Sequence, residues 1–151
     1  MEKRQPVQVA VNIYRKTLVK GLLVLGLLRI EEWGGFWQPV TGGVLQGESL
    51  EEAAFREVDE ETGITRPLFL FDLNYRYSFE LPEKYKIFYD EDVDTLTEHA
   101  FGYETDVADI ILSDEHTEYR WLTPPDALEL YEYPEYCEAL RRVIRHLDCQ
   151  K

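Results

Sequence analysis

Basic residues are scarce in this chain of 151 residues, which has 16 Lys and Arg against 30 Asp and Glu and a formal net charge of −14. Proteins that bind duplex nucleic acid present a basic surface to the phosphates, and anionic membranes attract basic segments for the same reason. The charge balance therefore argues against nucleic-acid and membrane partners. Residues 48–61 and 80–118 carry the whole acidic excess. Two interpretations remain open: a solvated acidic surface, or carboxylates that hold cations.

Cysteine is nearly absent, with Cys137 and Cys149 alone and no CxxC pair. Two cysteines do not make a disulfide framework, so we expect reduced thiols. Long apolar runs are absent too, because residues 22–28 fall far short of the roughly 20 residues that a membrane-spanning helix needs. The N-terminal residues lead into an alternating pattern rather than the apolar core of a signal peptide. We therefore expect a cytoplasmic, unprocessed protein.

Alternating apolar residues predict strands, and helical periodicity begins after residue 49. The predicted strands cover residues 7–13, 22–30, 69–79, 99–105 and 117–122. The predicted helices cover residues 50–62 and 134–147, with a short helix opening at Pro124. Residues 33–37 and 41–43 are predicted to be glycine loops, and the acidic residues 82–97 a longer loop. Strands interleaved with helices predict one α/β or α+β domain over residues 1–151.

The helix at 50–62 places two glutamates where apolar side chains are expected. Ser49 and Glu52 form a capping-box pattern at its start, and Gly63 fits its end. On a helical wheel, Glu57 and Glu61 fall in the middle of the apolar face and Glu60 at its margin. Its apolar members are Leu50, Ala53, Ala54 and Val58. Carboxylates four residues apart repel each other, and a hard divalent cation such as Mg²⁺ would relieve that repulsion.

The spacing around this helix is more specific than the helix itself. Gly42 is followed after five residues by Glu48, and seven residues later by the run from Arg56 to Ile64, which reads REVDEETGI. This pattern matches the Nudix box at every position over 23 residues, and the chain resembles a Nudix hydrolase. The alternative, an acidic surface helix in a different register, does not account for the glycines and the arginine.

The resemblance implies a Nudix α/β/α sandwich with a mixed β-sheet and a loop–helix–loop catalytic motif, acting with Mg²⁺ or Mn²⁺. It assigns Glu57 and Glu61 as metal ligands, with Glu60 assisting and the Gly42 carbonyl as a further ligand. Arg56 would orient a glutamate by ion pairing. Gly42 and Gly63 would shape the loop and the helix end, and Glu48 would brace the loop.

Two further stretches, residues 36–43 and 115–122, look like the branch that contains dihydroneopterin triphosphate and dNTP pyrophosphohydrolases. In that branch the glutamate matching Glu115 completes the metal site, with Glu98 and Glu118 as competitors here. Candidate substrate contacts are Arg29 for phosphate and Phe36 or Trp37 for a stacked ring, although either aromatic could instead belong to the core. His99 and His116 are predicted to be structural or exposed, and the alternating aromatics after residue 68 to be core.

The sequence thus predicts a Mg²⁺-dependent pyrophosphohydrolase that converts a nucleoside or pterin triphosphate to a monophosphate and pyrophosphate. Within the class, a dinucleoside polyphosphate or nucleotide-sugar hydrolase is the alternative. In a different class, the alternative is a non-catalytic module that senses a nucleotide. The expected partner is a small nucleotide-type molecule, and a homodimer would be unsurprising. The acidic residues 82–97 depart from the basic loop expected to grasp a triphosphate tail.

Overall fold

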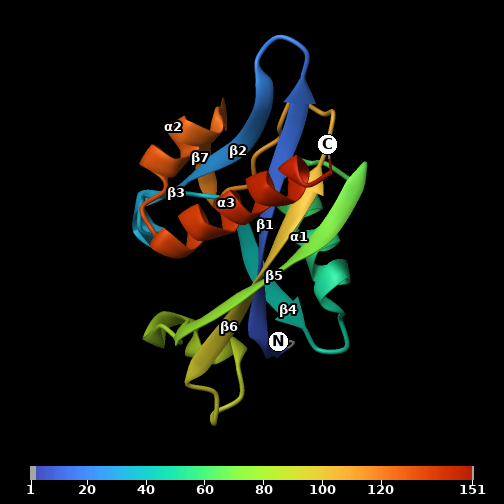
Figure 1. Ribbon diagram of the computed structural model, residues 1–151. Coiled ribbons are helices and arrows are strands. Elements are labelled where there is room, and N and C mark those ends of the chain that lie inside the picture. Colours follow the sequence, from blue (N-terminus) through green and yellow to red (C-terminus); the bar gives the residue numbers. More distant parts are fainter. Residues whose placement is uncertain (1–2, 151) are drawn as a thin grey trace.

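The computed structural model describes residues 3–150, in which strands and helices alternate as the sequence predicts (Figure 1). The strands are β1 (Arg4–Thr17), β2 (Gly21–Arg29), β3 (Trp37–Gln38), β4 (Val40–Leu45), β5 (Phe69–Glu80), β6 (Thr95–Glu104) and β7 (His116–Leu122). The helices are α1 (Leu50–Thr62), α2 (Pro124–Leu130) and α3 (Pro134–Asp148), with 3-10 turns η1 (Glu31–Trp33) and η2 (Glu83–Phe88). None of the helices in this range has the length and apolar character needed to cross a bilayer.

β1 lies at the centre of the sheet and divides its pairing among three neighbours. Residues 7–14 run parallel to β6, residues 8–11 pair antiparallel with β4 on the opposite edge, and residues 14–17 pair antiparallel with β2. β5 extends the sheet beyond β6, while β3 and β7 both pair with β2. One parallel pairing among antiparallel ones makes the sheet mixed, as predicted.

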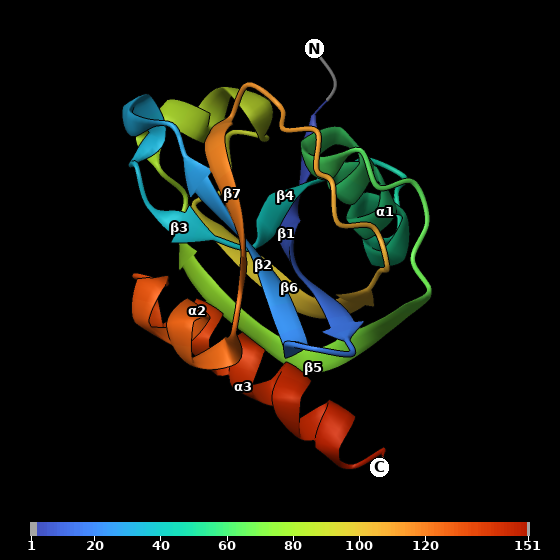
Figure 2. The ribbon, with the colours of Figure 1, turned by 90° about the horizontal axis from the view of Figure 1, so that it is seen from above.

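Helices cover both faces of this sheet, with α1 on one side and α2 and α3 on the other (Figure 2). The buried cluster on the α1 side includes Val9, Ala53 and Val58. The cluster on the other side includes Leu122 and Leu140. The predicted α/β/α arrangement is therefore confirmed, because each face of the sheet buries its own apolar layer.

The prediction of a glycine loop at residues 41–43 is wrong, because these residues belong to β4. Gly42 and Gly43 pair with Val9 and Gln8 of β1. Neither glycine has a positive φ, so a turn is not the reason for them. A Cβ on Gly42 would collide with the Glu57 carboxyl group. The glycine therefore permits the close approach of α1 to the sheet.

Residues 82–97 also contain more structure than the predicted loop, namely η2 and the start of β6. Leu81, Tyr89 and Leu96 form a small buried cluster beneath η2. The carboxylates of Asp90, Glu91, Asp92 and Asp94 are exposed. The acidic side chains of this segment thus form a solvated surface, while its apolar side chains hold it against the sheet.

Candidate active site

Helix α1 turns two glutamates inward, as its pattern predicts. The capping box is present: Ser49 Oγ accepts from Glu52 N at 3.1 Å, and Ser49 N donates to Glu52 Oε1 at 3.0 Å. Glu57 is 8% exposed and Glu61 3% exposed, between fully buried alanines and a valine, whereas Glu60 is exposed. The helix ends at Gly63, whose φ of 78° is left-handed.

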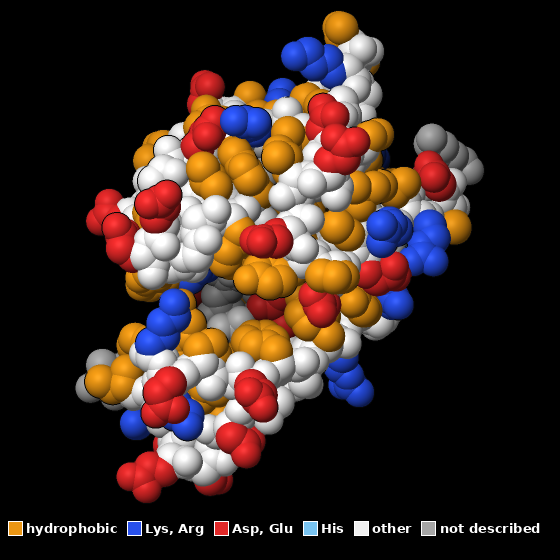
Figure 3. Space-filling view, turned by 90° about the vertical axis from the view of Figure 1, so that its left-hand side faces the viewer, with side chains coloured by type: hydrophobic (Ala, Val, Ile, Leu, Met, Phe, Trp, Pro, Cys, Tyr) orange, Lys and Arg blue, Asp and Glu red, His pale blue; other side chains and the backbone are white. Residues whose placement is uncertain are grey.

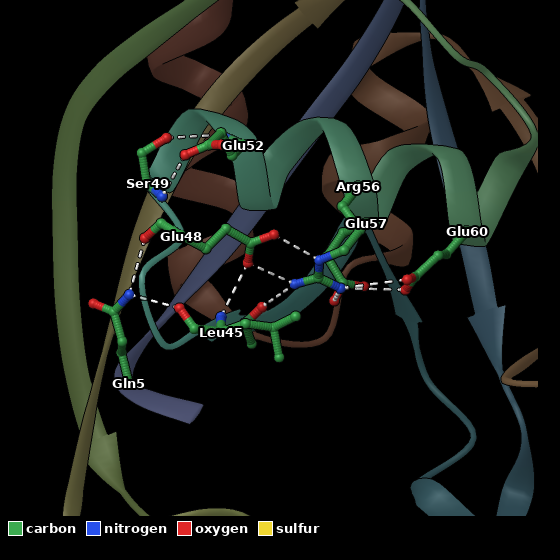
Figure 4. Close-up of polar contacts among 9 residues, drawn as sticks. Gln5, Leu45, Glu48, Ser49, Glu52, Arg56, Glu57 and Glu60 are labelled. Carbon is green, nitrogen blue, oxygen red and sulfur yellow. Dashed lines mark hydrogen bonds and ion pairs between the residues drawn. The ribbon is translucent and has the colours of Figure 1, made fainter. Parts of the chain in front are cut away.

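Arg56 fixes the position of Glu57 because its guanidinium makes several hydrogen bonds at once (Figure 4). Its guanidinium donates to both carboxylate oxygens of Glu48, at 2.8 and 2.9 Å, and to Glu57 Oε1 at 2.9 Å. It also donates to the Gly43 carbonyl at 2.8 Å. Glu48 in turn accepts from Leu45 N at 3.0 Å. Because the guanidinium is anchored at several points, it holds the Glu57 carboxyl group rigidly against β4.

The Glu57 carboxyl group has the surroundings of a cation ligand. It lies directly against Gly42, in space that any Cβ there would fill. Burial raises the pKa of Glu57 to about 7, an effect that the neighbouring Arg56 only partly opposes. A hard cation would supply the compensation that this buried carboxylate lacks, and oxygen donors are the ligands that Mg²⁺ prefers.

Glu61 is held from the other side by the segment that leads into β7. Ser113 Oγ donates to Glu61 Oε2 at 2.9 Å, and His116 Nδ1 lies 2.8 Å from the same oxygen. Burial raises the pKa of Glu61, but contacts with His116, Glu115 and Ser113 outweigh burial, and the pKa is lowered overall. The ring of His116 is buried, and its Nε2 lies 3.0 Å from Gln38 Nε2.

His116 and Ser113 were not recognised from the sequence as parts of this site. A single histidine without a second metal ligand nearby in the sequence does not indicate a site. The sequence therefore predicts only that His116 is structural or exposed, and not that it contacts Glu61. The partner is 55 positions away along the chain, so only the pairing of β7 with β2 brings the two together.

Glu115 is the candidate that the fold brings to Glu61. Burial and the neighbouring Glu61 both raise the pKa of Glu115. Of the competitors, Glu118 pairs with Arg120 at 3.1 Å. Glu98 lines the same cavity as Glu115 but accepts a hydrogen bond from the Tyr77 hydroxyl instead of contacting Glu61. Within residues 3–150, no three Asp, Glu, His or Cys side chains converge closely enough to enclose a metal ion.

A cavity of about 460 Å³ is lined by the glutamates Glu57, Glu98, Glu115 and Glu135, whereas Glu61 lies behind its wall. Figure 3 shows this face hollowed, with hydrophobic side chains around the opening and acidic ones inside. Gly42, Glu57 and Glu115 lie at one part of its wall. Its cationic lining residues are Arg4, Arg29 and Lys84. Its aromatic lining residues are Trp33, Phe36, Tyr85, Phe88, Tyr133 and Tyr136, with Tyr77 and Phe79 from β5.

The structure separates the predicted substrate contacts. Arg29 and Phe36 line the cavity, and the Phe36 ring lies edge-on to Tyr133 at 4.9 Å. Trp37 does not line it: of the two interpretations left open for Trp37, the structure supports a core residue, because its ring packs against the buried cluster beneath α2 and α3. Phe36 lies just before β3, and within β3 it is Gln38, not Trp37, that lines the cavity, since successive strand residues point to opposite faces. Tyr77 and Phe79, predicted as core, are half-buried cavity residues.

Comparison with known proteins agrees with this geometry. The NUDIX domain family model matches residues 4–147. A dihydroneopterin triphosphate diphosphatase of Escherichia coli is 33% identical over 130 residues, covering 84% of each chain. An octanoyltransferase of Myxococcus xanthus is 38% identical over 120 residues, which are 79% of this chain, and the match spans 31% of that protein.

Solved structures give the same result. The E. coli dihydroneopterin triphosphate pyrophosphohydrolase has a TM-score of 0.75 at 31% identity, covering 94% of this chain and 97% of that one. A Listeria monocytogenes structure described as a NUDIX hydrolase has a TM-score of 0.82 at 26% identity, covering 97% of both chains. The chain therefore belongs to the NUDIX domain family. It is a Nudix hydrolase, and pyrophosphohydrolases are among its relatives.

Proposed function

We propose that this protein is a Mg²⁺-dependent pyrophosphohydrolase that cleaves a nucleoside or pterin triphosphate to the monophosphate and pyrophosphate. The observation that carries the proposal is a single cavity that joins buried carboxylates, cationic side chains and aromatic rings. A triphosphate attached to a planar ring needs these three features together. The likeness to the E. coli dihydroneopterin triphosphate pyrophosphohydrolase supports the same substrate class.

In this proposal Glu57, Glu61, Glu115 and the Gly42 carbonyl hold the metal, with Glu60 contributing from the solvent side. The chemistry that Mg²⁺ or Mn²⁺ would supply at these residues is neutralisation of the pyrophosphate and a more acidic water molecule for attack on phosphorus. The chain's own part is positioning. Arg56 keeps the Glu57 carboxyl group against Gly42, and the 2.9 Å bond from Ser113 keeps Glu61 turned toward the β7 segment.

The cationic lining explains how an acidic protein admits an anionic substrate. Arg4, Arg29 and Lys84 face the cavity, whereas the carboxylates of residues 90–94 face solvent. The Arg29 guanidinium lies over the Trp33 ring, with its central carbon 4.9 Å from the ring centroid, and this contact positions the Arg29 side chain. The acidic 82–97 segment therefore contributes a lysine to the site and leaves its acidic side chains outside.

A substrate panel with Mg²⁺ tests the proposal. It covers dNTPs, dihydroneopterin triphosphate, diadenosine polyphosphates and nucleotide sugars, and it measures orthophosphate and pyrophosphate separately. We expect pyrophosphate and a monophosphate from a triphosphate substrate. Turnover confined to dinucleoside polyphosphates or nucleotide sugars would replace the proposed substrate class with that one.

A melting experiment separates catalysis from nucleotide sensing. Mg²⁺ binds the native site and not the unfolded chain, so saturating Mg²⁺ or Mn²⁺ should raise the melting temperature. The absence of any shift, together with no turnover in the panel, would favour a non-catalytic module.

A further inference from the structure

Glu98 is a buried carboxyl group that the proposed chemistry at phosphorus does not use. It lies on β6 opposite Gln8 of β1 and Tyr77 of β5, and Gln8 also pairs with Gly43 of β4. These residues form one row across four strands. Glu98 is 3% exposed and lines the cavity. With strands about 4.8 Å apart, the backbone of Glu98 is about 10 Å from that of Gly43, so Glu98 stands two strands away from β4 along the cavity.

The surroundings of Glu98 leave part of its hydrogen-bonding capacity unused. Tyr77 donates its hydroxyl to Oε1. No other hydrogen bond to this carboxyl group is made by the residues that the structure describes. A carboxylate has about four lone-pair sites on its two oxygens, so it can accept several donors. The cavity side of Glu98 is therefore available to a ligand.

The cavity wall next to Glu98 is suited to a flat ring. Tyr136 of α3 and Tyr133, the residue just before α3, line it together with Phe36. The Tyr133 ring stands edge to face with Phe36 at 4.9 Å and with Tyr136 at 5.7 Å. Aromatic side chains bury planar ligands efficiently, and a few polar groups then fix the orientation of the ligand. Glu98 is such a polar group, because it lines the same cavity as these rings and lies close enough to Tyr136 to raise the pKa of its hydroxyl, with Arg29 and Glu135 also nearby.

A carboxylate distinguishes rings by their donor patterns. It pairs best with two adjacent N–H donors, as it does with an arginine fork. Guanine and pterins present that edge, an amino group beside a ring N–H. Adenine and cytosine present a single amino donor beside a ring acceptor.

We propose that Glu98 is the specificity-determining residue that accepts both donors of this amino and ring N–H edge, selecting guanine and pterin substrates. The proposal rests on the proposed function, since the recognised ring is that of the triphosphate. Burial raises the pKa of Glu98 to about 7, against the opposing hydrogen bond from Tyr77. Two N–H donors would stabilise the ionised form inside the cavity.

Glu104 on the same strand provides a matched control. It too accepts a hydrogen bond from a tyrosine hydroxyl, that of Tyr14 at 3.2 Å, but it does not line the cavity. If a buried tyrosine–glutamate pair were only structural, Glu98→Gln and Glu104→Gln would have similar consequences. If Glu98 binds the amino and ring N–H edge, only Glu98→Gln changes the preference among ring ligands.

Calorimetric binding of dGMP, dIMP and neopterin to the wild type and both variants tests the proposal. dIMP differs from dGMP only by the missing amino group, and a hydrogen bond to a charged group corresponds to about 10- to 100-fold in affinity. We expect the wild type and Glu104→Gln to prefer dGMP over dIMP by that factor, and Glu98→Gln to lose the preference. Neopterin binding should weaken at least tenfold in Glu98→Gln alone.

Three results would overturn the proposal. The first is that dGMP and dIMP bind equally or undetectably while neopterin binding is unaffected by Glu98→Gln. The second is that Glu98→Gln keeps the full preference for dGMP over dIMP, and the third is that Glu104→Gln loses this preference as well. The wild-type comparison needs no variant to fold. Because these probes are not hydrolysed, the outcome is separate from the proposed function. Pyrophosphate release without ring selection would refute only the role of Glu98, and ring selection without pyrophosphate release would refute only the proposed reaction.

Discussion

Replacing Glu57 by Gln should stabilise the metal-free protein above pH 7 while removing its activity. The carboxyl group of Glu57 is buried, and burial raises its pKa from the ordinary 4.5 to about 7. Glutamine has nearly the same shape and keeps an oxygen that can accept the 2.9 Å hydrogen bond from Arg56. The substitution therefore removes a poorly compensated buried charge without opening a cavity.

The pKa difference sets the size of the effect. A rise from 4.5 to about 7 corresponds to about 3 kcal/mol, at 1.36 kcal/mol for each pH unit. The native state holds this proton more tightly than the unfolded chain, so the wild-type free energy of unfolding falls as pH rises from 4.5 to about 7. The penalty is complete above pH 7. For a domain of this length, about 3 kcal/mol is at most roughly 6–12 °C in melting temperature.

Thermal unfolding followed by circular dichroism, in EDTA from pH 4.5 to 8.5, measures this effect. Glu60→Gln is the matched control, because Glu60 is an exposed glutamate on the same helix. The Glu57→Gln and wild-type melting temperatures should converge at the acidic end and separate above neutrality. Saturating Mg²⁺ should raise the melting temperature of the wild type but not of Glu57→Gln. A Glu57→Gln protein less stable than the wild type at pH 8 in EDTA would refute this account of the buried charge.

Three further substitutions test other parts of the structure. Glu61→Gln should lower kcat at least ~100-fold with an unchanged circular dichroism spectrum, because a metal ligand is lost; near wild-type turnover would contradict the ligand role. Gly42→Ala puts a Cβ where the Glu57 carboxyl group lies. Mg²⁺ should then no longer raise the melting temperature. A persisting rise would show that Mg²⁺ binding does not need the Glu57 carboxyl group in that position. Leu140→Ala removes a side chain of α3 that is 1% exposed and packs against the sheet. It should cost about 2–5 kcal/mol in chemical denaturation, with kcat/KM at 25 °C unchanged. A smaller cost would mean that the core on this side collapses around the vacancy.

The prediction of α1 and its two inward glutamates rests on patterns among residues that are close together in the sequence. Capping, helical periodicity and fixed spacing all act within about 20 residues, and each depends on backbone geometry that neighbouring residues set. The same locality explains the wrong assignment at residues 41–43. Glycine predicts a turn in the absence of other information, whereas here it allows a strand to approach a helix.

Long-range contacts decided the rest of the site. Ser113 and His116 reach Glu61 because β7 pairs with β2, and Glu98 reaches the cavity because β1 runs parallel to β6. Phe36 and Trp37 are adjacent and chemically alike, so only the tertiary structure separates the cavity residue, in the loop before β3, from the core residue that begins β3. The sequence by itself determined the family, the helix α1 and the inward direction of its two glutamates. The tertiary structure decided which distant side chains complete the cavity, because sheet pairing joins residues whose separation along the chain leaves no local pattern.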